Sequence, residues 1–249
     1  MNIKKHIPNF ITLLNLLCGC IALVFVANEQ FGMAFFFVCL GIFLDFFDGF
    51  FARLFNVSSP LGLQLDSLAD MVTSGVVPGF VLYKILPSFA VTGHSSASFV
   101  PTFINNPYTI FPYLGFIVTL GACYRLANFN IDTRQTDSFI GLPTPANALV
   151  IMSIPLIVQN TDSLIALEIF TNKWFLLLVA CFSAYIMNAE IPLFSLKIKQ
   201  FSFAKYKLQI SFLILSVVLL IFFQFLGIPL LIFTYILLSI INNKQKKSV

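Results

Sequence analysis

Long apolar runs separated by short polar breaks occupy almost the whole chain. The runs fall at about residues 10–27, 32–54, 66–86, 109–129, 144–160, 172–189, 208–224 and 226–241. Each is close to the roughly 20 apolar residues that a helix needs to cross a bilayer core about 30 Å thick. The pattern predicts an all-α protein, a polytopic transmembrane helical bundle with about eight spans. Only "QFLGIP" (224–229) separates the last two runs, so a single broken or re-entrant helix is the alternative there.

Composition supports an integral membrane protein. Of the 249 residues, 59% are hydrophobic and only 10% are charged. A soluble domain carries about 25% charged residues, so a soluble protein is excluded. Eight spans with short loops leave no room for a separate soluble domain. We therefore expect residues 1–249 to form a single membrane domain.

The distribution of basic residues predicts the orientation. If both termini are cytoplasmic, only Lys84 and Lys173 fall on the outer side of the membrane. The inner side then holds Lys4, Lys5, Arg53, Arg125, Arg134, Lys197, Lys199, Lys205, Lys207, Lys244, Lys246 and Lys247. Cytoplasmic loops are enriched in Lys and Arg, so this distribution favours cytoplasmic termini.

Four aspartates interrupt the second and third apolar runs, in the stretch "LDFFDGFFARLFNVSSPLGLQLDSLAD" at residues 44–70. They are Asp45, Asp48, Asp66 and Asp70. The first two are three residues apart and the last two are four apart, so each pair shares one face of a helix. The two helices are antiparallel neighbours, so their acidic faces can meet near the cytoplasmic end of the membrane. Carboxylates at this depth repel one another and cost free energy unless positive charge compensates them.

A divalent cation is the compensating charge that this pattern favours. One guanidinium, that of Arg53, cannot neutralise four carboxylates, whereas one or two divalent ions could. All-oxygen ligation selects a hard cation such as Mg²⁺ or Mn²⁺. Gly49, Ala52 and Gly62 add small residues that let a ligand or another helix approach closely. A metal-filled pocket of this kind suits a phosphate-bearing substrate whose tail stays in the lipid.

Other interpretations of these acids remain open from the residues alone. The aspartates could be helix caps or interfacial loop residues, and Asp66 in particular could be an N-cap after "SSPLGLQL". The small residues could serve only helix packing. Intramembrane aspartates also line ion paths, so a cation-coupled transporter is a second class of function. A transporter usually has paired halves and broken helices, and no second set of acids matches this one.

The same residues carry a resemblance to a known family. Asp45, Asp48, Gly49, Ala52, Arg53, Gly62, Asp66 and Asp70 reproduce the pattern D-x-x-D-G-x-x-A-R-x8-G-x-x-x-D-x-x-x-D of the CDP-alcohol phosphatidyltransferases. The resemblance implies a metal-dependent membrane enzyme that moves a phosphatidyl group from a CDP-linked lipid to an alcohol and releases CMP. It implies that the four aspartates surround two metal ions and that Asp70 is the general base. It also implies that the remaining four signature residues hold the CDP group.

The acceptor alcohol is a finer question. The stretches "IPNFITLLNLLCGCIA" (7–22), "RLANFN" (125–130) and "FIGLPTPANA" (139–148) resemble the branch of the family that uses serine. Transfer from CDP-diacylglycerol to L-serine is therefore expected, in the inner membrane of a bacterium, with the active site facing the cytoplasm. Glycerol 3-phosphate or an inositol derivative is the alternative acceptor. Many relatives have a second arginine where Asn128 stands, and many are homodimers.

Arginines outside the signature are the candidate acceptor-binding residues. Arg125 or Arg134 could bind the carboxylate of serine through a bidentate pair. Each could equally be a membrane anchor at the end of an inner span. Asn9 and Thr12 could contact the nucleotide or bond only to the backbone, and the second role is favoured.

Overall fold

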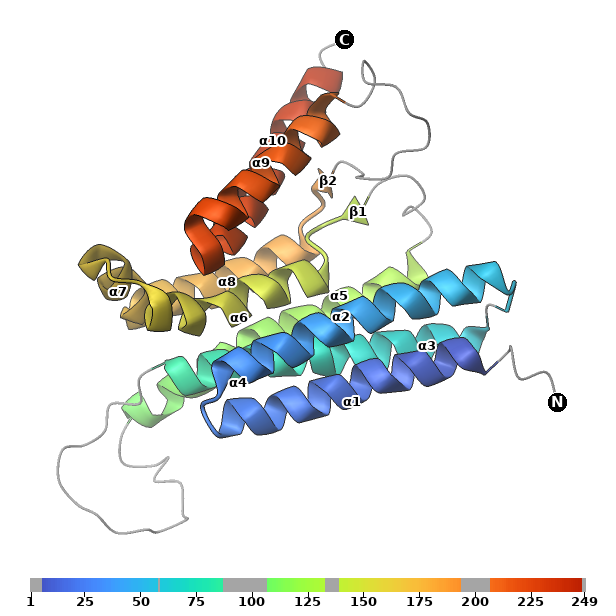
Figure 1. Ribbon diagram of the computed structural model, residues 1–249, viewed down its shortest axis with the longest axis horizontal. Coiled ribbons are helices and arrows are strands. Elements are labelled where there is room, and N and C mark those ends of the chain that lie inside the picture. The colour runs from blue at the N-terminus through green and yellow to red at the C-terminus, as the bar shows by residue number, and fades with distance from the viewer. Residues whose placement is uncertain (1–5, 58, 87–106, 133–138, 194–206, 248–249) are drawn as a thin grey trace, which may run out of the picture.

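The computed structural model describes residues 6–57, 59–86, 107–132, 139–193 and 207–247 (Figure 1). Almost all of these residues are helical, which confirms the all-α prediction. One short antiparallel ribbon pairs β1 (Phe139–Ile140) with β2 (Pro192–Leu193). It connects two segments that are far apart in the sequence, and each of them leads directly into or out of a long helix.

The first three apolar runs form a layer of long helices (Figure 1). They are α1 (Ile7–Ala27), α2 (Phe31–Leu54) and a third helical run made of α3 (Pro60–Asp70), the π-helix η2 (Met71–Val76) and α4 (Val77–Ile85). The third helix begins earlier than the expected residue 66. Ser59 is its N-cap, with the side-chain oxygen accepting from the Gly62 N–H at 3.0 Å, and Pro60 follows at the first helical position. Proline suits this position because its missing N–H would have no partner there.

The remaining helices pack against this layer or extend from it. They are η3 (Pro107–Phe116, a 3₁₀-helix), α5 (Ile117–Ile131), α6 (Thr144–Asn160), α7 (Leu164–Thr171), α8 (Lys173–Asn188), α9 (Lys207–Phe223), η4 (Gln224–Leu226) and α10 (Gly227–Lys247). α9 and α10 lie side by side and project from the rest (Figure 1). The chain therefore turns back at η4, where Gln224 has a positive φ of 47°. This hairpin replaces the single broken helix considered as the alternative.

Five helical stretches among the described residues are long and apolar enough to cross a membrane, and the bent pair α7–α8 would make a sixth. The stretch Gln209–Asn243 contains the α9–α10 hairpin, and α6 has 17 residues. Each of the eight predicted windows coincides with a helix, but the number of crossings and the side on which the termini lie stay predictions. The protein is an integral membrane protein.

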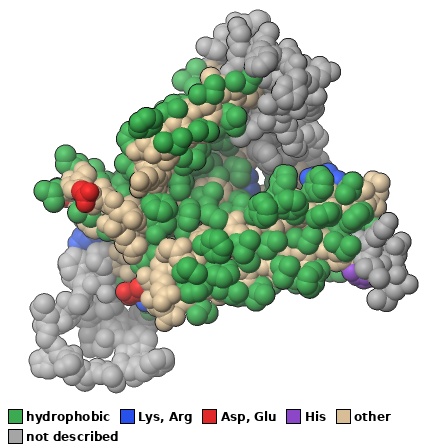
Figure 2. All heavy atoms as spheres, viewed as in Figure 1, with side chains coloured by type: hydrophobic (Ala, Val, Ile, Leu, Met, Phe, Trp, Pro, Cys, Tyr) green, Lys and Arg blue, Asp and Glu red, His purple; other side chains and the backbone are tan. Residues whose placement is uncertain are grey.

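Apolar side chains occupy both the inside and much of the outside of the bundle. Small and branched residues fill the centre, including Val26, Val38, Val77, Val81 and Ile151, none of them exposed. Large apolar side chains cover the outer faces of the long helices (Figure 2). Such a surface is expected where lipid rather than water is the surrounding solvent.

Candidate active site

The predicted acidic faces of α2 and α3 line one cavity of about 580 Å³. Its wall is completed by the start of α1, the end of α5 and the start of α6. All eight residues of the signature contribute to this wall: Asp45, Asp48, Gly49, Ala52, Arg53, Gly62, Asp66 and Asp70. The structure therefore brings together every residue expected from the pattern.

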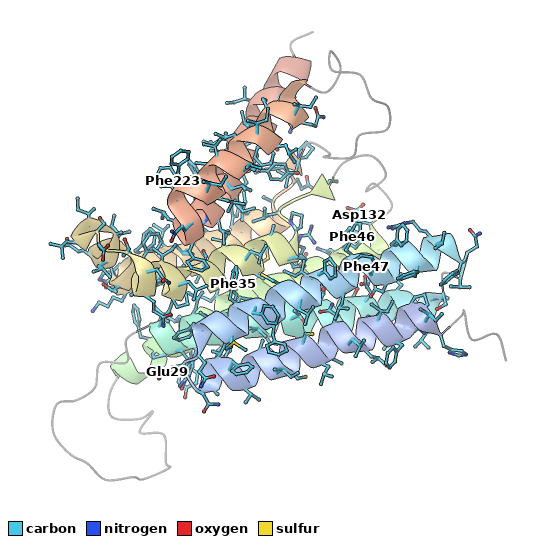
Figure 3. All side chains as sticks on the ribbon, viewed as in Figure 1. Glu29, Phe35, Phe46, Phe47, Asp132 and Phe223 are labelled. Carbon is cyan, nitrogen blue, oxygen red and sulfur yellow. The ribbon has the colours of Figure 1, made fainter. Side chains whose placement is uncertain are left out.

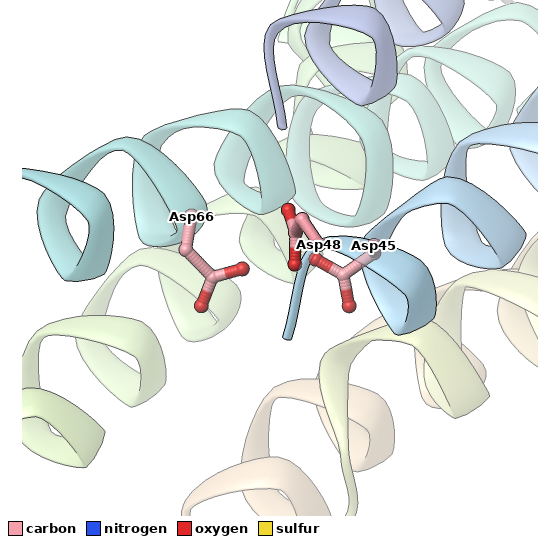
Figure 4. Close-up of side chains that lie close together, drawn as sticks. All are labelled: Asp45, Asp48 and Asp66. Atoms are coloured by element: carbon pink, nitrogen blue, oxygen red, sulfur yellow. The ribbon is translucent and has the colours of Figure 1, made fainter. Parts of the chain in front are cut away.

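Three of the aspartates form a compact cluster between α2 and α3 (Figure 4). Asp45, Asp48 and Asp66 each offer a carboxylate oxygen, and these oxygens lie within 4.8 Å of one another. Asp48 is buried, and the other two are partly buried. Oδ1 of Asp45 is buried and has no hydrogen-bond partner among the described residues. Because a buried carboxylate oxygen without a partner is costly, this atom is suited to bind a cation.

These carboxylates fit a hard divalent cation. Several mutually close carboxylates repel one another unless positive charge lies between them. The donor set is oxygen only, which matches the ligand preference of Mg²⁺ and Mn²⁺. The N-cap alternative for Asp66 is wrong, because Ser59 caps α3 and Asp66 lies inside the helix, facing the other two acids.

Asp70 lies one helical turn beyond Asp66 and lines the same cavity. It is 92% buried, since only 8% of its surface is exposed. Its Oδ1 accepts a hydrogen bond from Nδ2 of Asn15 on α1 at 3.3 Å. The π-helix η2 begins at the next residue. Such π-helical insertions occur frequently at functional sites, where they shift the side chains that follow.

Two polar residues on α1 donate hydrogen bonds to aspartates of the cavity. Thr12 Oγ1 donates to Oδ2 of Asp48 at 2.6 Å, and it is also 3.1 Å from the carbonyl oxygen of Pro8. Asn15, three residues later on the same face, supports Asp70. The sequence favoured a backbone bond alone for Thr12, and it gave no signal for Asn15. Contacts between distant helices are invisible in local spacing, so these two partners needed the structure.

Small residues leave space beside the signature arginine. A Cβ added at Gly49 would lie 3.6 Å from Nη1 of Arg53, and Ala52 lines the same wall. Gly62 borders the cavity opposite Asn9, whose Oδ1 would be 3.2 Å from an added Cβ. A guanidinium next to bare backbone can reach an anionic group directly.

Arg125 enters the cavity from α5. Only 8% of its surface is exposed, its guanidinium lies over the ring of Phe129 at 5.9 Å, and its Nε has no partner among the described residues. The alternative role of Arg125 as a membrane anchor is therefore wrong, because an anchor extends to the headgroups. Arg134, the other predicted acceptor-binding residue, lies outside the described residues.

Comparison with known proteins identifies the family of this chain. The family model described as CDP-alcohol phosphatidyltransferase matches residues 5–186, which include the whole wall of the cavity. The chain belongs to the CDP-alcohol phosphatidyltransferase family. Enzymes of this family are generally dependent on divalent metal ions, which agrees with the donor set of the acidic cluster.

Two individual proteins also resemble the chain. The chain is 35% identical over 155 residues to the CDP-diacylglycerol–serine O-phosphatidyltransferase of Bacillus subtilis, covering 60% of this chain and 76% of the relative. It is 28% identical over 255 residues to the protein of the same name from Helicobacter pylori, covering 97% of this chain and 96% of the relative. The second match includes the α9–α10 hairpin, which lies beyond the family model.

The phosphatidyltransferase cavity also has wall residues that sequence reasoning did not assign. Pro143, Thr144 and Pro145 line it from the start of α6. Ser67 on α3 and Asn130 on α5 hydrogen-bond to each other, joining the two helices beside the cavity. The resemblance in "RLANFN" and "GLPTPANA" therefore corresponds to segments that adjoin the site.

Proposed function

We propose that the protein transfers the phosphatidyl group of CDP-diacylglycerol to L-serine, giving phosphatidylserine and CMP. The observation that carries the proposal is the convergence of all eight signature residues and Arg125 on one cavity. The relatives from Bacillus subtilis and Helicobacter pylori, whose names specify serine as the acceptor, support the choice of alcohol. Family membership makes the protein an enzyme, which sets aside the transporter alternative.

The metal site of this enzyme comprises the four aspartates, Asp45, Asp48, Asp66 and Asp70. We assign Mg²⁺ or Mn²⁺ to it, with two ions, because four carboxylates carry more charge than one ion and Arg53 balance. With the four aspartates holding them, divalent ions would supply Lewis-acid polarisation of the diphosphate and would stabilise the negative charge on the leaving CMP.

The chain's own residues position the substrates and move the proton. Arg53, which lies beside Gly49 and lines the cavity with Ala52, holds the anionic diphosphate. Asp70 accepts the hydroxyl proton of serine as the oxygen forms its bond to the phosphorus of the phosphatidyl group. The bond from that phosphorus to the CMP oxygen breaks, and CMP departs with the electron pair. Asn15 keeps the Asp70 carboxylate turned toward the cavity.

The setting of this chemistry is also part of the proposal. Residues 1–249 form a single enzyme domain in the inner membrane of a bacterium, with both termini and the cavity on the cytoplasmic side. The excess of Lys and Arg on that side supports this orientation. Because many relatives are homodimers, we propose the same assembly for this enzyme.

CMP release by the purified protein tests the acceptor. With CDP-diacylglycerol and Mn²⁺ or Mg²⁺, we expect L-serine to support release, because the relatives named for this reaction resemble the chain over most of its length. Glycerol 3-phosphate, inositol and inositol phosphate, supplied separately, are expected to support little. EDTA should abolish the reaction and added metal should restore it. Activity with another acceptor but not with serine would contradict the proposed acceptor, and inactivity with every acceptor and metal would contradict the reaction itself.

Thr12→Val is expected to raise the Mn²⁺ concentration needed for half-maximal activity by about 10- to 100-fold, the usual effect of losing a partner that orients a metal ligand. The valine keeps the size of the side chain but removes the 2.6 Å hydrogen bond to Asp48. Titration of activity with Mn²⁺ measures the effect. Thr12→Ser retains a hydroxyl and is the matched control. If Thr12→Val had the metal dependence of the wild type, the hydrogen bond from Thr12 would not be what orients Asp48.

A further inference from the structure

The wall that α6 contributes to the substrate cavity has no capping side chain to fix it. Pro143, Thr144 and Pro145 line the cavity, and only 1% of the surface of Thr144 is exposed. Pro143 is the N-cap residue of α6 and makes no side-chain capping hydrogen bond. Helix starts usually obtain such a bond from Ser, Thr, Asp or Asn. The position of this wall therefore depends on what holds the residues before it.

The residues before the wall are bound through their backbone to α8 and to the segment after it. Strand β1 pairs with β2. The Gly141 N–H then donates to the carbonyl oxygen of Ile191 at 3.0 Å, and the Leu142 N–H donates to that of Ile186 at 3.1 Å. Gly141 has a φ of 74°, and a Cβ at this position would clash with the backbone of α8. Only glycine combines this conformation with so close an approach.

Strand β2 is supported in turn by α10. Because Gly141 bonds to Ile191, the neighbouring pair Ile140–Pro192 directs its backbone groups away from the antiparallel ribbon. Nδ2 of Asn243 on α10 donates to the carbonyl oxygen of Pro192. Asn243 thus supplies the partner that the ribbon does not. Figure 1 shows the ribbon between the α9–α10 hairpin and the rest of the bundle.

The α9–α10 hairpin has other anchors besides Asn243. The ring of Phe225 in η4 lies edge-on to the ring of Phe35 on α2, which Figure 3 labels, with centroids 5.9 Å apart. Leu142, which follows β1, and Ile236 of α10 are buried in one apolar core. Loss of the single hydrogen bond from Asn243 is therefore expected to leave the hairpin docked and to weaken the support of β2.

We propose that Asn243 is a positioning residue for catalysis, which holds β2 and, through the β1–β2 ribbon, sets the position of the wall at residues 143–145. The inference rests on the proposed function, since the wall acts on the substrates that fill the cavity. Of the described residues, Asn243 is outside the cavity wall, so its effect passes through the ribbon. Both β2 and α10 lie beyond the family model, which ends at residue 186. The C-terminal part of this chain therefore adds a support to the cavity of the family.

Asn243→Leu tests this assignment in the full-length purified enzyme. The leucine keeps the approximate size of the side chain but removes the donor. The kcat/KM is therefore expected to fall by about two- to tenfold, the effect of one lost hydrogen bond. The Mn²⁺ dependence should match the wild type, because the four aspartates lie on α2 and α3. Asn243→Gln keeps an amide donor and should recover most of the loss.

The matched control is Asn242→Leu, the same substitution at the adjacent residue. Asn242 makes no side-chain hydrogen bond in the part of the chain that the structure describes. Its replacement should leave kcat/KM at the wild-type value. An equal loss in the two variants, or no loss in Asn243→Leu, would overturn the inference.

Hydrogen exchange shows whether the effect passes through the ribbon. The bonded amides of Gly141 and Leu142 become open to exchange when the ribbon loosens. Mass spectrometry of the substrate-free enzyme should show faster exchange at residues 139–142 in Asn243→Leu, with wild-type exchange in α1 and α2. Faster exchange throughout, with a lower thermal midpoint, would make Asn243 a residue for stability alone and overturn the assignment.

A double-mutant cycle with Thr144→Ala identifies the wall as the target. Residues that act independently multiply their losses in kcat/KM, whereas residues that act through one element do not. The loss in Thr144→Ala combined with Asn243→Leu should therefore be smaller than the product of the single losses, by about twofold or more. Multiplicative losses, or wild-type exchange at residues 139–142 in Asn243→Leu, would overturn the inference.

The exchange experiment needs no substrate, so its result stands even if another alcohol proves to be the acceptor. The kinetic comparisons are then made with that acceptor. Serine-dependent CMP release by the wild type, in contrast, tests the proposed function alone.

Discussion

Asp70→Asn is expected to lower serine-dependent CMP release by about 10²- to 10⁴-fold, the range associated with loss of a positioned general base. The amide keeps the size of the side chain, but it cannot take the hydroxyl proton from the acceptor. Asn15 donates to Oδ1 of Asp70, and the same hydrogen bond can reach the amide oxygen, so the side chain should keep its position. Initial rates with saturating serine and CDP-diacylglycerol measure the loss.

Asp162→Asn is the matched control for Asp70→Asn. It changes an exposed acid between α6 and α7 and should leave the rate unchanged. Binding of CDP-diacylglycerol should persist in Asp70→Asn, because Arg53 and the other three aspartates remain. A variant that retains more than about a tenth of the wild-type rate would assign the proton to another group. Loss of CDP-diacylglycerol binding together with activity would make Asp70 chiefly a metal ligand.

Local spacing in the sequence was sufficient to predict the acidic cavity. Asp45 with Asp48 and Asp66 with Asp70 recur at intervals that place each pair on one helical face, and the helices that carry them are neighbours in the chain. The structure accordingly has carboxylates of α2 and α3 within one cluster. Geometry that depends on a single helix or on a short connection can be deduced from residue intervals.

Contacts between helices distant in the sequence were not predictable in this way. Thr12 and Asn15 reach Asp48 and Asp70 across 36 and 55 residues, and nothing in the spacing of α1 indicates these partners. The burial of Arg125 depends likewise on the packing of α5 against other helices. Hydrophobic periodicity tells which elements exist and which face is apolar, but it leaves the pairing of helices undetermined.

The predicted start of the third helix was also wrong, and the reason is local. The third helix starts at Pro60 and not near residue 66, because Ser59 satisfies the first free N–H groups and proline needs no partner at that position. The hydropathy of "SSPLGLQLD" is low at this end, so a window based on apolar residues misses the first turn. A capping signal is more precise than hydropathy for such a start.

The α1–η2 contact, which fixes Asn15 beside Asp70, depends on a glycine. A Cβ added at Gly19 would lie 2.6 Å from Oγ1 of Thr73 and 3.1 Å from both its Cα and its backbone nitrogen. Oγ1 of Thr73 in turn donates to the carbonyl oxygen of Asn15 at 3.2 Å. The two helices therefore meet backbone to backbone, one turn from Asn15, which hydrogen-bonds to the proposed general base Asp70.

Gly19→Leu is consequently expected to destabilise the protein by about 1–3 kcal/mol or more, since overpacking forces the backbones of α1 and η2 apart. It should also reduce CMP release by more than the loss of folded protein explains, because Asn15 moves away from Asp70. The thermal midpoint in detergent and the rate per folded molecule measure the two effects. Gly32→Leu is the matched control, because a Cβ at Gly32 would meet nothing within 4 Å. If Gly19→Leu matched Gly32→Leu in both measurements, close contact between α1 and η2 could not be what positions Asp70.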